Sequence, residues 1–441
     1  MGTKWHVSVY FLLAPPARIS PRGGLVAISG ACIVEFIPCC SPFQKPRSFQ
    51  PPPPPPPPHP TDWGRSPGPC LVVRSHKGVL LLLPQVMATF FDCFCGAGGL
   101  TCGLRAAGLR HLGGCDLDRY ACDSYEANHG AVLRGDMRHL TAAMVLAATG
   151  GRVPDLLAAS PPCQSVSSVG RTAKTAHAND RLYLEVVRLA LELGSKAVLI
   201  ENVAAFSIKR AECGTTLVCL AAAALQVWGR YNAPSANPNV DAQLPAGPQE
   251  AGFVVEHRIL DAADYAVPQH RRRTILLAAK PPCSWRWPAT DPGRPPRFRD
   301  FAMTDEDARL STVGGYDLFM SPEKSSYYLK RKRANPNYTH FVDPDAVPRT
   351  LRAGYLKSRG AEALVAREAA GELTATPDQN CSSMRMMSLA EIKTIQSFPH
   401  DYKLCGPAGA VYQQVGNAVP PLLAAALGRG LSLGQGERGD D

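Results

Sequence analysis

The sequence lacks the features of a membrane or secreted protein. None of its apolar runs approaches the roughly 18 residues of a membrane-spanning helix, and its start poorly meets the needs of a secretory signal, which are a basic beginning, a longer apolar centre and a small-residue cleavage site. It contains 15 cysteines but no pair of CxxC units of the kind that binds zinc. We therefore expect reduced thiols, no metal, no membrane association and an intracellular location.

Charged residues are also sparse, at 19% of 441 residues, whereas 45% are hydrophobic. A chain of this length and composition can bury a large core and has room for a second, smaller domain. The formal net charge of +10 favours an anionic partner, although an excess of lysine and arginine often forms only a solvated surface. Composition alone thus slightly favours nucleic acid as a partner.

Residues 1–86 differ from the rest of the chain. They carry apolar fragments and an uninterrupted proline run at 51–58, which requires extended polyproline II backbone. We expect this segment to be a disordered, proline-rich extension. Ordered-looking sequence begins at Met87, and we expect the functional domain to start there.

From Met87 onward, short β-rich runs alternate with amphipathic helical stretches such as 180–194. The strand-like runs are 88–92, 111–118, 131–136, 155–160, 197–203, 253–260 and 273–279. This alternation predicts an α/β fold with a mostly parallel sheet and helices on both faces. Ligands in such folds bind beyond the carboxyl ends of the strands, so the loops there are the candidate sites.

The loop after the first strand is rich in glycine. Asp92 leads into Gly96, Gly98 and Gly99, but Thr101 breaks the GxGxxG pattern of dinucleotide-binding proteins. Glycines let the backbone approach a bound nucleotide closely. An ordinary strand-to-helix turn would need only one of them.

Acidic residues end the next two strands. Asp116 stands at about the spacing where a carboxylate binds ribose hydroxyls, and Asp136 ends the third strand. Either acid alone is more often a helix cap. Together with the glycines, they favour a nucleoside cofactor without a pyrophosphate, which points towards S-adenosylmethionine.

Side chains capable of chemistry end the fourth and fifth strands. Pro161 and Pro162 fix the backbone ahead of Cys163, and a rigid loop at the mouth of a sheet can hold an accessible thiolate. A lone cysteine is as often a small buried hydrophobe. Glu201 and Asn202 interrupt an apolar strand, where a carboxylate is costly unless it has a partner or a function.

Gln269, Arg271 and Arg273 come just before the last apolar strand. Because strand side chains alternate, the two arginines are predicted to share a face. Two guanidinium groups on one face suit phosphate or a carboxylate partner, and the alternative is a basic solvated edge.

These motifs, in this order, resemble the cytosine-C5 methyltransferases of DNA over about residues 88–427. The motifs that carry the resemblance are DCFCGAGG, CDLDRYA, GD, PPCQ, ENV, PQHRRR, RMMSLAEIKTIQSFPHDY and YQQVGNAVPPLL. Three positions depart from the family: Asp116 stands for a usual glutamate, Val166 for a usual phenylalanine, and Ser160 for a common glycine. None of the three is a reacting group.

The resemblance implies a Rossmann-like, S-adenosylmethionine-dependent catalytic domain and a small target-recognition domain. The implied division is a catalytic domain at 87–280, a recognition region at 281–380, a C-terminal return to the catalytic domain at 381–430 and a tail at 431–441.

The resemblance also implies a covalent mechanism. Cys163 adds to C6 of cytosine, and Glu201 neutralises the negative charge that develops on the ring. The other members of the implied catalytic set are Gln164, Asn202, Arg271 and Arg273.

A cofactor pocket is implied in the same way. In it Phe94 stacks on adenine, Asp116 holds the ribose and Asp136 meets the adenine amine. The full implied set is Asp92, Phe94, Gly96, Gly98, Gly99, Asp116, Asp136, Pro162, Asn417 and Ala418.

The implied partner of this enzyme, which we expect to be monomeric, is double-stranded DNA. The target cytosine has to be flipped out of the duplex, and the small polar segment 164–180 suits a loop that closes over it. The insert at 230–250 is predicted to be a surface loop. The residues expected to contact nucleic acid are Gln269, Lys330, Arg331, Lys332 and Arg333, the basic four following Tyr327 and Tyr328.

Two alternatives stay open. One branch of the family modifies transfer RNA and also carries SPPCQ, although its characteristic CFT tripeptide is absent from this sequence. A binding protein with a decayed active site is disfavoured because the whole implied catalytic set is present. The proline run hints at a eukaryotic nucleus, and a bacterial chain would be expected in the cytoplasm or nucleoid.

Overall fold

The computed structural model describes most of the chain after Met87. The described ranges are 87–162, 182–207, 252–291, 293–311, 313–335, 341–356, 364–378 and 381–433, with the short pieces 9–10, 33–34, 70–74, 80–84, 218–219, 221, 227–228 and 249–250. Cys163, Gln164 and the predicted 164–180 loop lie outside the described residues, as does most of the 230–250 insert.

The chain divides into two units, Met1–Val86 and Met87–Asp441. In the first unit, β1 (Val9–Tyr10) pairs antiparallel with β2 (Ile33–Val34), and β3 (Cys70–Arg74) with β4 (Leu80–Pro84). The sequence predicts no strands there. The second ladder is explained by its runs of Val and Leu, which favour extended pairing.

A seven-stranded sheet forms the centre of the second unit, in the order β12-β13-β9-β8-β5-β6-β7. Its strands are β5 (Thr89–Cys93), β6 (Arg110–Asp116), β7 (Val132–Arg134), β8 (Leu156–Ala159), β9 (Ala197–Val203), β12 (Val254–Asp261) and β13 (Arg272–Ala279). The mostly parallel sheet predicted from the sequence is confirmed, except that β13 runs antiparallel to both neighbours. The β12–β13 connection holds only a 3-10 turn, η4 (Ala262–Tyr265), which is too short for a parallel crossover.

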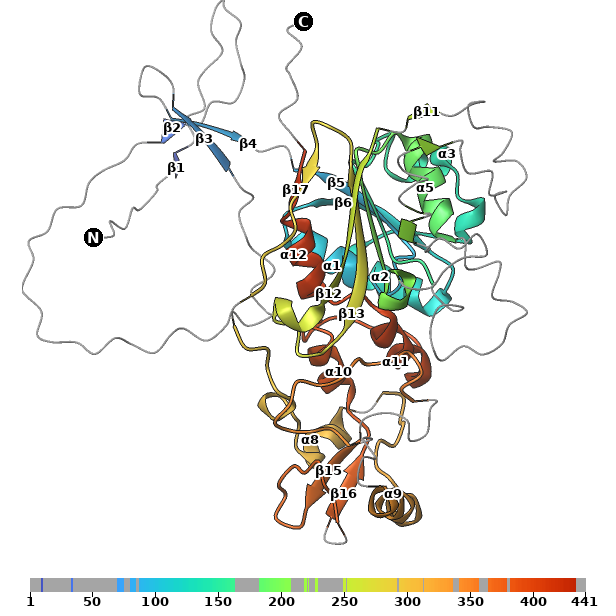
Figure 1. The fold of residues 1–441 in the computed structure, drawn as a ribbon, viewed down its shortest axis with the longest axis vertical. Coiled ribbons are helices and arrows are strands. Elements are labelled where there is room, and N and C mark those ends of the chain that lie inside the picture. Colours follow the sequence, from blue (N-terminus) through green and yellow to red (C-terminus); the bar gives the residue numbers. More distant parts are fainter. Residues whose placement is uncertain are drawn as a thin grey trace, which may run out of the picture. The chain divides into compact units, whose positions relative to one another are not determined.

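Helices cover both faces of this sheet, as the alternation predicts (Figure 1). The helices α1 (Gly99–Ala106), α2 (Arg119–His129) and α12 (Pro421–Gly428) lie on one face, and α3 (Ala142–Ala148) and α5 (Leu182–Leu193) lie on the other. None of the helices in the described ranges is long and apolar enough to cross a membrane.

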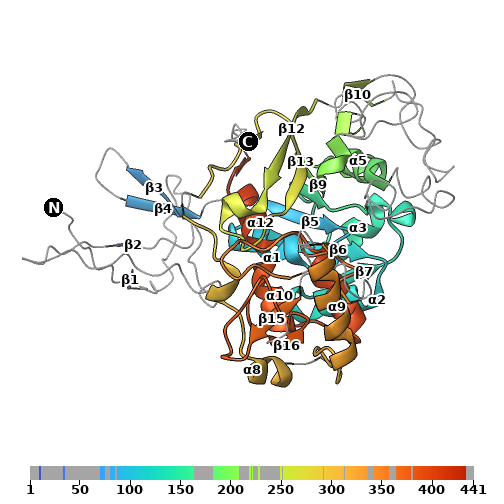
Figure 2. The same cartoon turned by 60° about the horizontal axis from the view of Figure 1, so that its bottom comes forward.

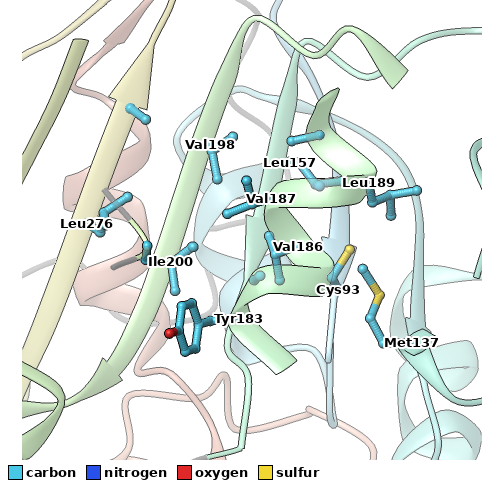
Figure 3. Close-up of a cluster of buried hydrophobic side chains, with 14 of the residues drawn as sticks. Cys93, Met137, Leu157, Tyr183, Val186, Val187, Leu189, Val198, Ile200 and Leu276 are labelled. Atoms are coloured by element: carbon cyan, nitrogen blue, oxygen red, sulfur yellow. The ribbon is translucent and has the colours of Figure 1, made fainter. Parts of the chain in front are cut away.

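The core under α5 shows why its sequence is a helix. Apolar side chains recur every three or four residues, and Figure 3 shows Val186 and Leu189 directed at the strands. They pack against residues such as Leu157, Val198 and Ile200, all of them buried. This packing holds β8 and β9 side by side, and both strands lead into the candidate site.

A third core lies beyond the sheet in the C-terminal half. It is built from α8 (Asp305–Leu310), α9 (Pro322–Ala334), α10 (Leu389–Ile395), α11 (Ala408–Asn417) and the antiparallel pair β15 (Val365–Glu368) and β16 (Cys381–Arg385). Figures 1 and 2 show α10 between the sheet and the β15–β16 pair. The remaining short elements are η2 (Met137–His139), η3 (Ala204–Ser207), η5 (Phe298–Asp300), and the pairs β10 (Val227–Trp228) with β11 (Gln249–Glu250) and β14 (Ser284–Trp285) with β17 (Leu431–Ser432).

The C-terminal return packs directly onto α1. A Cβ atom added at Gly103 would overlap the carbonyl oxygen of Pro421 and lie 2.5 Å from the Cβ of Ala424. The two helices therefore approach as closely as their backbones allow, and only glycine fits at this position. Their contact ties the first loop of the sheet to a segment more than 300 residues away.

A buried polar network lies behind the glycine-rich loop. Asp92 is fully buried, and its Oδ2 accepts a hydrogen bond from Thr101 Oγ1 at 2.7 Å. The same hydroxyl meets Tyr125 Oη at 2.9 Å, and Tyr125 in turn meets His111 at 2.6 Å. Asp92 Oδ1 has no hydrogen-bond partner among the described residues.

Burial determines how this network titrates. It raises the pKa of Asp92 to about 7, against the hydrogen bond from Thr101 and with the help of the nearby Asp116 charge. It lowers the pKa of His111 to about 4, and the Arg105 charge acts in the same direction. Asp92 is therefore largely protonated below neutral pH, and His111 is neutral.

We expect replacement of Asp92 by Asn to change how stability depends on pH. The unfolded carboxyl ionises near pH 3.8 and the folded one only near pH 7, so its proton stabilises the fold at low pH. As pH rises from 4 to 8, the wild type should lose roughly 4 kcal/mol relative to Asp92→Asn. Urea unfolding of both proteins at pH 4, 5.5 and 8 measures this difference.

Asp155→Asn is the matched control for this pH dependence. The pKa of Asp155 lies below its ordinary value because hydrogen bonds from Lys196 and Thr89 outweigh partial burial. Its contribution is therefore constant above pH 5. A pH-independent stability difference for Asp92→Asn across the whole range would show that Asp92 is ionised in the fold.

We also expect Gly103→Ala to destabilise the second unit by about 2 kcal/mol, because the new methyl group has to push α12 away from α1. Gly409→Ala is the control, since a Cβ there would meet no atom within 4 Å and helical alanine is more stable than glycine by up to about 1 kcal/mol. Urea midpoints should shift in opposite directions. Equal midpoints would mean that the helices can separate freely.

Candidate active site

The glycine-rich loop between β5 and α1 has an unusual backbone. Phe94 adopts a φ of 56° and Gly96 a φ of 54°, both in the left-handed region. The Phe94 side chain is half-buried and packs against the core under α5. A non-glycine residue in this region is strained, and such strain concentrates at ligand sites.

The three predicted pocket glycines have different surroundings. A Cβ at Gly96 would meet no atom within 4 Å, whereas one at Gly98 would lie 2.5 Å from the His129 ring. One at Gly99 would overlap the carbonyl oxygen of Val419. Gly98 and Gly99 are buried positions where packing leaves no room for a side chain, and Gly96 faces open space.

Asp116 joins the second strand end to this loop. Its carboxylate accepts the backbone N–H groups of Gly96 and Asp118, each at 2.8 Å. Burial raises its pKa, although those two N–H groups oppose the shift. Leu117 beside it is 70% exposed, an apolar side chain that sequence reasoning missed although it stands alone between two acids.

This loop region fits a nucleoside. The open side of Gly96 leaves room next to the backbone, the Asp116 carboxylate offers acceptors, and the Leu117 side chain offers an apolar surface. Asp92, also predicted in the pocket, is fully buried and turned towards Thr101. The structure thus gives Asp92 a supporting position behind the loop.

Asp136 differs from its predicted position at a strand end, because β7 ends at Arg134. The Asp136 side chain caps η2 through the backbone N–H of Arg138 and binds the Arg138 guanidinium at 2.5 Å. That hydrogen bond lowers the pKa of Asp136. The residue is therefore an ionised helix cap with part of its carboxylate exposed.

Glu201 lies at the centre of the candidate site. It is 5% exposed, and its Oε1 accepts from Arg273 Nε at 2.9 Å. Its Oε2 accepts a hydrogen bond from Ser160 Oγ. A buried carboxylate with one charged and one neutral donor is held in a single orientation and can bind a polar ligand edge.

Asn202 anchors the start of the loop that leads to the cysteine. Its Nδ2 donates to the carbonyl oxygen of Pro161 at 3.2 Å, and Ser160 N donates to the carbonyl oxygen of Cys93, also at 3.2 Å. Pro162, the last described residue before Cys163, is exposed. The chain is thus held beside Glu201 at Ser160 and Pro161, and Cys163 lies outside the described residues.

Two predicted residues of the PQHRRR motif are buried away from Glu201. The Arg271 guanidinium is 2% exposed and donates to the carbonyl oxygens of Leu351, Gly416 and Ala418. It binds the end of α11, where helix carbonyls lack partners within the helix. Arg271 therefore holds the segment with Asn417, which is exposed, and the half-buried Ala418.

Gln269 has no exposed surface, which corrects its prediction as a nucleic-acid contact. Its side-chain amide donates to the Ile395 carbonyl oxygen at 3.2 Å and to Gln396 Oε1 at 2.5 Å, and its oxygen accepts from Leu351 N at 2.7 Å. All its polar atoms are used in joining the third core to the sheet.

The predicted basic cluster lies on α9. Ser321 caps this helix and Pro322 begins it, a start signal that sequence reasoning missed. Lys330, Arg331 and Arg333 are exposed, and the Arg331 guanidinium lies over the Tyr327 ring at 5.3 Å. Lys332 differs, because it is half-buried on the side of the helix that carries the buried Tyr328.

Among the residues with described positions, no group of three or more His, Cys, Asp or Glu side chains could hold a metal ion.

Comparison with known proteins identifies the family. The model of the C-5 cytosine-specific DNA methylases matches residues 88–221 and 247–432. The chain is 26% identical over 358 residues to the type II methyltransferase M1.HphI of Haemophilus parahaemolyticus, covering 77% of the chain and 85% of that protein. It is 27% identical over 364 residues to M.Eco47II of Escherichia coli, covering 77% and 78%.

Solved structures show the same fold. The S. pombe Dnmt2 methyltransferase matches with a TM-score of 0.52 and 15% identity, over 77% of this chain and 96% of that one. The Entamoeba histolytica methyltransferase EhMeth matches with a TM-score of 0.55 and 16% identity, over 78% and 97%. The chain therefore belongs to the C-5 cytosine-specific DNA methylase family, enzymes that use S-adenosylmethionine to methylate C5 of cytosine in DNA.

Proposed function

We propose that this enzyme methylates a flipped-out cytosine through a covalent adduct with Cys163, with Glu201 as the acid. The observation that carries the proposal is the position of Glu201. Its buried carboxylate is bound to Ser160 and Arg273, and Ser160 lies three residues before Cys163. The acid and the start of the cysteine loop are thus parts of one hydrogen-bonded unit.

The chemistry requires both groups. The Cys163 sulfur, as a thiolate, forms a bond to C6 of cytosine, and the electron pair of the C5–C6 double bond becomes available at C5. Glu201, acting as a carboxylic acid hydrogen-bonded at N3 and the exocyclic amine, donates its proton to N3 and so neutralises the charge that the addition puts on the ring. After C5 takes the methyl group, loss of the C5 proton restores the double bond and expels the sulfur.

S-adenosylmethionine supplies the methyl group as an electrophilic sulfonium. The residues that fit its nucleoside part are Phe94, Gly96, Asp116 and Leu117, through an apolar face, open backbone and carboxylate acceptors. Asp136, Pro162, Asn417 and Ala418 complete the proposed pocket. Asp116 would accept from ribose hydroxyls through the lone pairs that the two backbone N–H groups leave free.

The exposed face of α9 is the proposed DNA-backbone contact. Three exposed basic side chains and an exposed tyrosine lie on one short helix, and phosphate contacts position a protein without reading sequence. We propose that the enzyme works as a monomer, in the nucleus of a eukaryote or the cytoplasm of a bacterium.

The first test is transfer of label from labelled S-adenosylmethionine to duplex DNA and, in parallel, to total transfer RNA. We expect the full chain to label DNA, and Cys163→Ala to lower the rate by at least about 10³-fold because the nucleophile is lost. Cofactor binding by Cys163→Ala should be unchanged.

Cys219→Ala is the matched control, since Cys219 is a free, exposed thiol elsewhere in the chain, and its activity should equal that of the wild type. If only transfer RNA were labelled, the substrate would be RNA and the proposal of a DNA substrate would be wrong. Cofactor binding without transfer to either would leave an inert binding protein, and transfer by Cys163→Ala would exclude the covalent mechanism.

A second test addresses α9. We expect the double variant Lys330→Ala/Arg333→Ala to weaken DNA binding equally for unrelated sequences, and to reduce the slope of log K against log salt concentration by about 2. The control is Arg110→Ala/Arg152→Ala, which removes two exposed charges, one at the first residue of β6 and one in the segment before β8. Equal slopes for the two variants would place the DNA elsewhere.

A further inference from the structure

Ser160 stands beside Glu201 because of strand register. The last pair between β8 and β9 joins Ala159 to Ile200, so the next positions in the parallel ladder are Ser160 and Glu201. Side chains at equal positions of neighbouring parallel strands point to the same face. The Ser160 hydroxyl and the Glu201 carboxylate are thus cross-strand neighbours, and they form a hydrogen bond.

The strand on the other side of β9, β13, supplies the second donor to Glu201. On β13, Ile275 pairs with Glu201, and Arg273 lies two residues away on the same face. Its guanidinium binds Oε1, while Ser160 binds Oε2. Each carboxyl oxygen of Glu201 therefore receives one hydrogen bond: Oε1 from Arg273 on β13, and Oε2 from Ser160, which follows β8. The two donors together fix the rotation of the carboxyl group.

Ser160 is itself anchored. Its backbone N–H donates to the Cys93 carbonyl oxygen at 3.2 Å, and the carbonyl oxygen of the next residue, Pro161, accepts from Asn202 at 3.2 Å. The hydroxyl therefore acts from a fixed backbone. A glycine or alanine at this position would keep both backbone bonds and remove the donor to Oε2.

We propose that Ser160 is a positioning residue for the methyl transfer, whose hydroxyl orients the Glu201 carboxyl group towards the target base. The proposal rests on the function proposed above for Glu201 and Cys163. It predicts that the hydroxyl contributes when the ring becomes charged, and much less to the binding of DNA or S-adenosylmethionine.

The test compares the full chain with Ser160→Ala, Ser160→Gly and Ser160→Thr in steady-state methyl transfer to duplex DNA. We expect alanine and glycine to lower kcat by roughly tenfold to a hundredfold, with KM for DNA and Kd for S-adenosylmethionine unchanged. Threonine keeps the hydroxyl and should restore most of kcat. Adduct formation on duplex DNA containing 5-fluorocytosine should slow in parallel with kcat.

Ser207→Ala is the control for loss of a hydroxyl. Ser207 Oγ lies 2.7 Å from Thr274 Oγ1 near the end of β9, without contacting Glu201. Its kcat should equal that of the wild type. Wild-type kcat in Ser160→Ala would overturn the positioning role, and so would an equal loss in Ser160→Ala, Ser160→Thr and Ser207→Ala.

Failure of the underlying function gives a different result. In that case the wild type itself forms no adduct with 5-fluorocytosine and its methyl transfer does not depend on Cys163, whatever residue stands at 160. That result overturns both proposals, whereas the outcomes above, obtained with an active wild type, decide only the role of Ser160.

Discussion

The candidate site depends on one buried carboxylate. Glu201 is 5% exposed, and its carboxyl group is held by Arg273 at 2.9 Å and by the hydroxyl of Ser160. Removing one partner of a buried ion pair typically costs about 3–5 kcal/mol. The three strands that carry these side chains therefore have to keep their register, and the same register brings Pro161 against Asn202.

A second constraint is the close packing of the C-terminal return. Gly99 and Gly103 lie against the backbone of Val419 and Pro421, where a side chain larger than that of glycine would overlap a carbonyl oxygen. Arg271 binds the carbonyl oxygens at the end of α11. Both sides of the proposed cofactor pocket are thus held by contacts between distant segments, and neither forms from a local motif alone.

Several site residues have a different position from the one that their motif suggests. Gln269 and Arg271 belong to the arginine-rich motif PQHRRR, yet both are buried and bind carbonyl groups of the third core. Gly98 and Gly99 satisfy packing, while Gly96 faces open space. A family motif indicates that a residue contributes to the structure or the function, and the burial of its side chain shows whether that side chain can contact a ligand.

The sequence by itself determined the seven strands of the central sheet, their alternation with helices, and the chemical groups at the strand ends, because strand pattern, glycine spacing and an acid in an apolar strand are local properties. It also singled out Glu201 and Arg273 as functional residues, although their contact comes from the pairing of β9 with β13. Only the tertiary structure decided that β13 is antiparallel, that Lys332 turns inward and that Ser160 binds Glu201. Those features depend on pairing and burial between segments far apart in the chain, which no local pattern encodes.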